Sequence, residues 1–223
     1  MTFLRPTYII SILIAIAVHE WAHAMSARKL GDPTAEIAGR LTLNPISHID
    51  PIGALLFITV GFGWAKPVPV NPSYFRHPKR GMAITALAGP VSNFILAFLS
   101  FMGVLLLSGG ASGSIMGLLE TSTAANPFLT VFQQIFRDSL FVNLALMAFN
   151  LFPIAPLDGS NIVQMFVPAH LEDRYHDFVR AGPFLLLGLI LLETFLPIQI
   201  LSGWVFGIMQ GVLTLFGAVV GIL

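Results

Sequence analysis

Cysteine is absent from this chain of 223 residues, which excludes disulfides, thiolate metal sites and a cysteine nucleophile. Charge is scarce as well. Charged residues make up 10% of the sequence, whereas about a quarter of a soluble domain is charged, so an ordinary water-soluble protein is excluded. Eleven Lys and Arg residues balance eleven Asp and Glu residues. No basic surplus exists to neutralise phosphates, and we expect no nucleic-acid partner.

Apolar sequence is what the chain has in abundance. Hydrophobic residues make up 56% of it and the mean hydropathy is +0.84, which also excludes disorder. We expect a single domain over residues 1–223 that is an all-α multi-pass membrane protein. Its expected architecture is a core of three transmembrane helices plus additional helices, with a small membrane-associated β-hairpin or re-entrant segment.

Five apolar stretches carry this expectation, because a helix needs about 20 apolar residues to cross a bilayer. They predict three spans, at residues 8–27, 82–107 and 139–152, the last of which follows an amphipathic lead-in at 127–138. They also predict a closing hairpin of two helices, at 184–196 and 200–223, that turns at Pro197.

Residues 52–64 are apolar but short for a crossing helix. Basic residues lie in the sequence on both sides of them, so a crossing would place basic loops on both faces of the membrane, against the positive-inside tendency. We therefore expect this segment to dip in and return, or to be short and tilted. The flanking stretches 40–44 and 66–71 are expected to be strands, because the first alternates apolar and polar residues and the second has prolines at alternate positions, as an edge strand does.

The distribution of basic residues also predicts an orientation. Residues 108–126 contain no Lys or Arg and are expected on the outer side of the membrane. Residues 167–180 carry Arg174 and Arg180 among acidic residues and are expected to form a solvated cytoplasmic segment. The N-terminus is then outside.

The first span contains the sequence HEWAH at residues 19–23, which is an HExxH pattern. Residues four apart lie on one face of a helix, so His19 and His23 can bind one zinc ion together. Glu20 lies beside them and can take a proton from water at the metal. The alternative is chance, or two histidines that pack against other helices, but ionisable residues inside a membrane helix are costly and rarely lack a role.

A catalytic zinc usually has three protein ligands and an open position, so the pattern requires a third ligand. The preferred candidate is Asp158, in the segment NLFPIAPLDG at 150–159, where two prolines break the third span. The alternative is that Asp158 only caps the helix that starts at Gly159. Glu193 is expected near the membrane interface, and the remaining histidines are expected at the solvated surface: His48, His77, His170 and His176.

Taken together, these motifs resemble those of the site-2 proteases, the intramembrane zinc metalloproteases. The sequence GPVSN at 89–93 matches the Gly-x-x-x-Asn pattern of that family, and residues 39–53 and 63–72 are similar to the membrane-associated strands and loop of its compact prokaryotic branch. The resemblance covers about residues 8–167, and the chain shows neither the PDZ nor the CBS domains of larger relatives. A catalytic core at about 8–167 and a C-terminal hairpin at about 182–223 are the parts it implies.

The resemblance implies that one Zn²⁺ per chain is bound by His19, His23 and Asp158, and that Glu20 is the general base. It implies the hydrolysis of peptide bonds within or near transmembrane segments of membrane proteins, as in regulated intramembrane proteolysis. The partners are then a transmembrane substrate and the lipid bilayer of the cell membrane. His19 precedes Arg28 by nine residues, which places the metal roughly 13 Å below the cytoplasmic charged layer, so the active site would open toward the cytoplasm.

The resemblance also implies that Asn93 and Asn150 line the site and hold the substrate backbone or the oxyanion. Read from the residues alone, Asn93 could instead satisfy backbone groups freed at a Gly-Pro kink. Asn150 shares a helical face with Asn143, so either could make an interhelical hydrogen bond.

Two other functions stay open on the sequence. One is a catalytically silent scaffold that binds transmembrane helices, which the intact HExxH pattern argues against. The other is a metal transporter, since intramembrane His and Asp residues also mark ion pathways. A transporter would more often show repeated halves, and we find no internal repeat.

Overall fold

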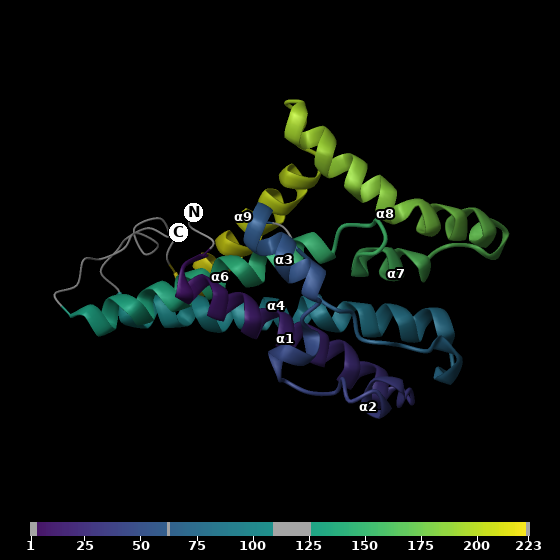
Figure 1. Cartoon of the computed structure of the whole chain (residues 1–223), viewed down its shortest axis with the longest axis horizontal. Helices are drawn as coiled ribbons and strands as arrows, with labels where there is room; N and C mark the ends of the chain where they lie inside the picture. Colours follow the sequence, from purple (N-terminus) through teal and green to yellow (C-terminus); the bar gives the residue numbers. More distant parts are fainter. Residues whose placement is uncertain (1–3, 62, 109–125, 222–223) are drawn as a thin grey trace.

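The computed structural model describes residues 4–61, 63–108 and 126–221. Within these residues the secondary structure is helical throughout, with no strand (Figure 1). Three short 3-10 turns lie at Pro45–His48, Pro72–Tyr74 and Ala169–Leu171. The α-helices are α1 (Pro6–Lys29), α2 (Thr34–Ile37), α3 (Pro51–Val60), α4 (Pro78–Leu107), α6 (Pro127–Asn150), α7 (Asp158–Gln164), α8 (Glu172–Phe195) and α9 (Leu201–Val220).

Helices α1, α4 and α6 pack side by side and form the centre of the molecule (Figure 1). The core between α4 and α6 contains Phe101 from α4 with Leu140 and Leu144 from α6, all fully buried. Helix α9 closes this core with Phe216, whose ring lies 5.6 Å from the ring of Phe101 between centroids. The expected three-helix core is therefore present.

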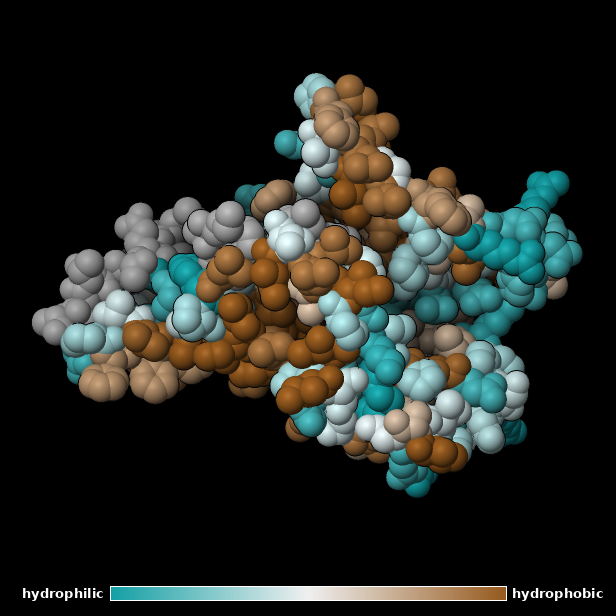
Figure 2. Space-filling model, in the orientation of Figure 1, coloured by the Kyte–Doolittle hydropathy of each residue, from teal (hydrophilic) through white to brown (hydrophobic). Residues whose placement is uncertain are grey.

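Among the described residues, four helices are long and apolar enough to cross a membrane, in agreement with a multi-pass membrane protein. They are Pro6–Lys29, Pro78–Leu107, Ala169–Phe195 and Leu201–Val220. An apolar band covers the middle of the molecule, and hydrophilic residues gather where α8 begins (Figure 2).

Helix α6 is the core helix that does not belong to those four. It is one continuous helix of 24 residues rather than a lead-in followed by a span, and its length of about 36 Å suffices for a crossing. Its buried carboxylate is paired inside the protein. Asp138 accepts hydrogen bonds from Arg5 (2.9 Å), Thr7 (2.6 Å) and Gln134 (2.9 Å), so one end of α1 is tied to α6.

The short apolar segment turns back on itself, as expected of a re-entrant segment. Helix α3 has only 10 residues and ends at Gly61, which adopts a left-handed conformation with φ of 79°. Ala65 then pairs with Ile49 in an antiparallel bridge, so both ends of the segment lie together. The carbonyl oxygen of Trp64 approaches Gly53 so closely that a Cβ there would lie 2.2 Å from it.

The strands expected at 40–44 and 66–71 do not form, and the β-hairpin prediction is wrong. Pro67 and Pro69 have no N–H to donate to a ladder. The backbone N–H groups between and around them bind three unrelated partners: Lys66 donates to the His48 carbonyl, Val68 to Glu20 and Asn71 to Asp32. An extended segment results, fixed point by point to the rest of the protein.

The C-terminal hairpin is formed by α8 and α9, with its turn at 196–200 as predicted. Helix α8 begins at Glu172, so the solvated segment expected at 167–180 runs without a break into the apolar helix. The carboxylate of Glu193 accepts a hydrogen bond from the backbone N–H of Ser202 (3.1 Å) and so caps the start of α9. The expected outer loop at 108–126 falls almost entirely outside the described residues.

Asp32 fixes the far end of the extended segment. It is fully buried, and its two carboxylate oxygens accept hydrogen bonds from the backbone N–H of Thr34 (2.9 Å) and of Asn71 (2.7 Å). Burial by itself raises the pKa of Asp32, but the hydrogen bonds from Thr34 and Asn71 outweigh it and hold this pKa below its usual value.

We predict that Asp32→Asn lowers the free energy of unfolding by about 1–3 kcal/mol, because an amide has only one acceptor oxygen and leaves one N–H unpaired. With a lowered pKa in the folded state, the wild-type contribution is present above the unfolded pKa of about 3.9 and is lost as the pH falls through the folded pKa. Heat unfolding in detergent at neutral and acidic pH measures both effects. The control is Asp50→Asn, because one Asp50 oxygen accepts both of its hydrogen bonds. Equal stability of the two variants would contradict the prediction.

Candidate metal centre

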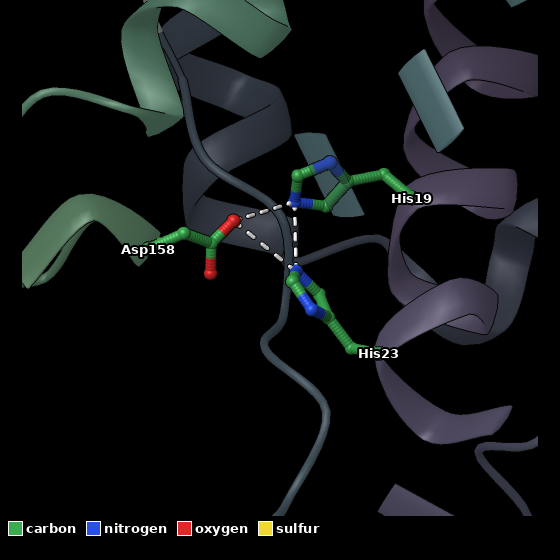
Figure 3. Close-up of side chains that lie close together, drawn as sticks. All are labelled: His19, His23 and Asp158. Carbon is green, nitrogen blue, oxygen red and sulfur yellow. Dashed lines mark hydrogen bonds and ion pairs between the residues drawn. The ribbon is translucent and has the colours of Figure 1, made fainter. Parts of the chain in front are cut away.

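His19 and His23 lie one turn apart on α1 and point to the same side (Figure 3). Both are buried, and their Nε2 atoms are 2.9 Å apart. Asp158 reaches them from the opposite side, with Oδ2 at 3.3 Å from each Nε2. His23 and Asp158, which are 135 positions apart in the sequence, thus meet.

Asp158 reaches this place because the chain breaks after α6. Pro153 and Pro156 prevent the helix from continuing, and α7 starts at Asp158 itself. Gly159 lets the new helix pack tightly on this break: a Cβ at that position would lie 2.4 Å from the carbonyl oxygen of Leu151.

The other nitrogen of each imidazole is held by a second helix. Nδ1 of His23 lies 2.7 Å from the backbone carbonyl oxygen of Thr85, and Nδ1 of His19 lies 2.6 Å from Oδ1 of Asn93. A carbonyl oxygen only accepts, so each Nδ1 donates and each neutral ring keeps a lone pair on Nε2. Metal-binding histidines are usually oriented by a second hydrogen bond of this kind.

The three donor atoms fit a metal ion. Two imidazole lone pairs and a carboxylate oxygen face one another, and buried Asp158 Oδ2 has no hydrogen-bond partner among the described residues. Zinc bonds of about 2.0–2.2 Å require distances of roughly 3.3–3.6 Å between tetrahedral ligands, and two of the three sides of this triangle are 3.3 Å. His19, His23 and Asp158 are also the group in the described chain whose geometry can hold a metal ion.

Glu20 is buried next to the two histidines. Its Oε2 accepts a hydrogen bond of 3.0 Å from the backbone N–H of Val68, in the extended segment 65–71. Within the described part of the chain Oε1 has no such partner, so one carboxylate oxygen is held and the other is left to accept a proton.

The extended segment is itself held in place beside Glu20. Arg40, which is buried, donates from Nη2 to the carbonyl oxygen of Lys66 (2.6 Å). His48 was expected at the surface, but it is fully buried, and this expectation is wrong. Its ring bonds to the carbonyl oxygen of Thr42 (2.8 Å) and its own carbonyl accepts from Lys66 (2.9 Å). The other three histidines expected at the surface are exposed.

Helix α4 passes directly against the imidazoles. A Cβ at Gly89 would lie 2.4 Å from His23 Nε2 and 2.5 Å from His19 Cε1. A stripe of buried small or short polar residues at every fourth position allows this approach; it consists of Gly81, Thr85, Gly89, Asn93 and Ala97. Sequence reasoning did not assign Thr85 or the contact of Gly89, although the spacing of this stripe was the available signal.

The two candidate asparagines lie in different surroundings. Asn93 is fully buried, and its amide bonds to His19 on one side and to Asn143 on the other. Asn150 is half-buried, and its side-chain nitrogen donates to the carbonyl oxygen of Leu146 in its own helix (3.0 Å). A catalytic role for Asn150 stays a prediction. The interhelical hydrogen bond considered for Asn143 does form.

A largely buried His-His-Asp set beside a glutamate, in a bundle with helices long and apolar enough to cross a membrane, is typical of a membrane-embedded zinc metalloprotease. The comparisons with known proteins agree. Residues 7–190 match Peptidase family M50, so the chain belongs to that family, the site-2 proteases, and is a metalloendopeptidase. No solved structure matches the chain.

Several relatives carry names that match this family. "Putative zinc metalloprotease YwhC" of Bacillus subtilis is 44% identical over 165 residues, which cover 74% of this chain and 71% of that protein. "Putative zinc metalloprotease Rip2" of Mycobacterium tuberculosis is 30% identical over 212 residues, or 92% of this chain and 72% of that protein. The Rip2 protein of Mycolicibacterium smegmatis is 27% identical over 157 residues, or 68% and 54%.

We predict that Gly89→Ala lowers zinc affinity at least about tenfold, because the new methyl group displaces two imidazoles that are fixed at their other nitrogens. Zinc affinity of purified protein, measured by competition with a chromophoric chelator, tests this. Gly207→Ala in α9 is the matched control, since nothing lies within 4 Å of a Cβ there. Equal zinc affinities in the two variants would show that the close approach of α4 does not determine the positions of the two imidazoles.

Proposed function

We propose that this protein hydrolyses peptide bonds within or near the transmembrane segments of other membrane proteins, with His19, His23 and Asp158 as zinc ligands and Glu20 as the general base. The observation that carries the proposal is that the three donor atoms meet beside a buried glutamate. This glutamate and both histidines lie on α1, a helix that is apolar enough to cross a membrane. Regulated intramembrane proteolysis is the setting that this activity fits.

Each residue has a distinct part in the proposed reaction. Bound zinc would supply Lewis acidity, which polarises the scissile carbonyl and acidifies water. Glu20 accepts the proton of the attacking water on Oε1 and passes it to the leaving amine. The hydrogen bond from Val68 keeps Oε2 occupied and fixes the direction of the carboxylate. Asn150, at the end of α6, stays our candidate for contact with the substrate backbone.

We further propose that the site opens toward the cytoplasm of a cell membrane. Seven of the eleven basic residues lie in the sequence near the end of α1 or near the starts of α4 and α8, which are at the same end of the bundle (Figure 1). Arg40 and Lys66 belong to the segments packed beside Glu20. Lys79 and Glu172 form an ion pair of 2.5 Å that joins the starts of α4 and α8 there. The other two, Arg5 and Arg137, lie near the opposite end, where Arg5 is neutralised by Asp138. This asymmetry favours a cytoplasmic location for the basic end.

Our first prediction from this proposal concerns metal content. Purified wild-type protein should contain about one zinc per chain, His23→Ala and Asp158→Ala should lose it, and Glu20→Gln should keep it, because glutamine replaces a residue that is not a ligand. Elemental analysis of detergent-purified protein measures this without any knowledge of the substrate. A well-folded wild type that takes up no zinc would remove the enzyme assignment and favour a helix-binding scaffold.

Our second prediction concerns cleavage. Membranes that contain the wild type should accumulate new peptide termini inside hydrophobic segments, and membranes that contain Glu20→Gln should not, because the base is missing while the metal stays. Mass spectrometry of peptide termini compares the two, with equal expression as the control. If the two variants gave identical termini, a scaffold would be favoured, and zinc flux into protein-loaded vesicles would favour a transporter.

A further inference from the structure

A buried chain of hydrogen bonds starts at His19 and crosses from α1 to α4 and then to α6. Oδ1 of Asn93 lies 2.6 Å from Nδ1 of His19. Nδ2 of Asn93 donates to Oδ1 of Asn143 (2.8 Å), and Nδ2 of Asn143 donates to the backbone carbonyl oxygen of Ser139 (2.8 Å). Asn93 and Asn143 are both fully buried.

The direction of this chain is set at its far end. The carbonyl oxygen of Ser139 can only accept, so the amide of Asn143 must turn its nitrogen toward α6 and its oxygen toward Asn93. Asn93 must then present its nitrogen to Asn143 and its oxygen to His19. A second carbonyl oxygen, that of Ala15, lies 3.4 Å from the same Asn93 nitrogen and requires the same orientation. A flipped amide at either asparagine would place two acceptors or two donors against each other.

The direction determines which nitrogen of His19 carries the proton. An amide oxygen at Nδ1 requires a proton on Nδ1, which leaves the lone pair on Nε2, the atom that faces His23 and Asp158. On the basis of the proposed zinc site, we propose that Asn143 is a positioning residue for the metal: through Asn93 it fixes the tautomer and the ring orientation of His19.

His23 shows why His19 needs this chain. Its Nδ1 donates directly to a backbone carbonyl oxygen, that of Thr85, so its tautomer depends on no side chain. His19 lies opposite an amide, which has both an acceptor and a donor end and can turn either way. The Asn93 amide therefore needs a partner that distinguishes its two ends, and of its two acceptors Asn143 is the closer, at 2.8 Å against 3.4 Å for the carbonyl oxygen of Ala15.

The position of Asn143 inside the apolar core supports this role. Its neighbours on α6, Leu140, Leu144 and Met147, are buried core residues. An amide in such surroundings is costly unless it is fully paired. The pairing it has connects the metal ligand on α1 to the backbone of α6.

The test is the zinc affinity of Asn143→Leu, which has a similar volume and can neither accept from Asn93 nor donate to Ser139. We expect zinc affinity to fall by about 10–100-fold, the usual effect of losing a hydrogen bond behind a metal ligand. Competition with a chromophoric chelator measures the affinity, and heat unfolding in the presence of a chelator reports the fold independently of the metal. Asn143→Ala serves the same purpose if Leu is not tolerated.

A rescue variant separates positioning from packing. Asp at position 93 accepts on both oxygens, so it keeps the proton on His19 Nδ1 whichever way it turns. Asn93→Asp combined with Asn143→Leu should therefore regain most of the affinity that Asn143→Leu loses, although the packing at position 143 is unchanged. No rescue in this double variant would overturn the proposal.

Ser100→Ala is the matched control. The Ser100 hydroxyl donates to Oγ of Ser139 (2.8 Å), which itself lies 3.2 Å from Nδ2 of Asn143. Its removal leaves the shorter bond from Asn143 to the Ser139 carbonyl oxygen (2.8 Å) in place, so zinc affinity should be unchanged. Equal losses in Ser100→Ala and Asn143→Leu would indicate general loosening of the core and overturn the proposal, as would wild-type affinity in a folded Asn143→Leu protein. Failure of the wild type to bind zinc would overturn the proposed function as well, so the two failures are distinguishable.

Discussion

The meeting of three electron-pair donors inside an apolar bundle is the constraint on which the rest of the structure depends. It needs two histidines on one face of α1 and a break after α6, at two prolines, so that Asp158 can reach them. It also needs small residues on α4, which allow that helix to pack directly against both imidazole rings. Each requirement explains one irregular feature of the sequence: the ionisable residues in α1, the broken end of α6, and the small residues of α4.

The buried polar groups of this bundle that hold helices together form hydrogen bonds with defined partners on other parts of the chain. At one end of the bundle Asp138 gathers three donors from α1 and α6, and near the site the amides of Asn93 and Asn143 pair with each other. Beside Glu20, the extended segment has its backbone groups bound one by one to Asp32, Arg40 and His48. Because no water competes for such groups in a membrane interior, an ordered network of this kind specifies one packing of the helices.

The sequence predicted what local spacing can encode. Periodicity and length predicted that two histidines four residues apart share a helical face, and they predicted the apolar spans and the short re-entrant segment. Asp158 followed because a third ligand was required and the other candidates were less suitable. Partners distant in the sequence were not predictable. His48 was assigned to the surface because nothing near it in the sequence shows that Lys66 and Arg40 enclose it. The strand prediction failed because neither the alternation in 40–44 nor the alternate prolines in 66–71 reveal that Lys66, Val68 and Asn71 each donate to a partner elsewhere in the chain.

The tautomers of the two histidines have an electrostatic consequence. With both rings neutral, Asp158 and Glu20 bring two negative charges to one buried place, and neither forms an ion pair with a lysine or arginine among the described residues. A zinc ion carries two positive charges, so the loaded centre is neutral overall, and neutrality is the state that an apolar medium tolerates best. A metal bound there would be a counter-ion of the fold as well as a Lewis acid, and its binding would be coupled to folding of the protein.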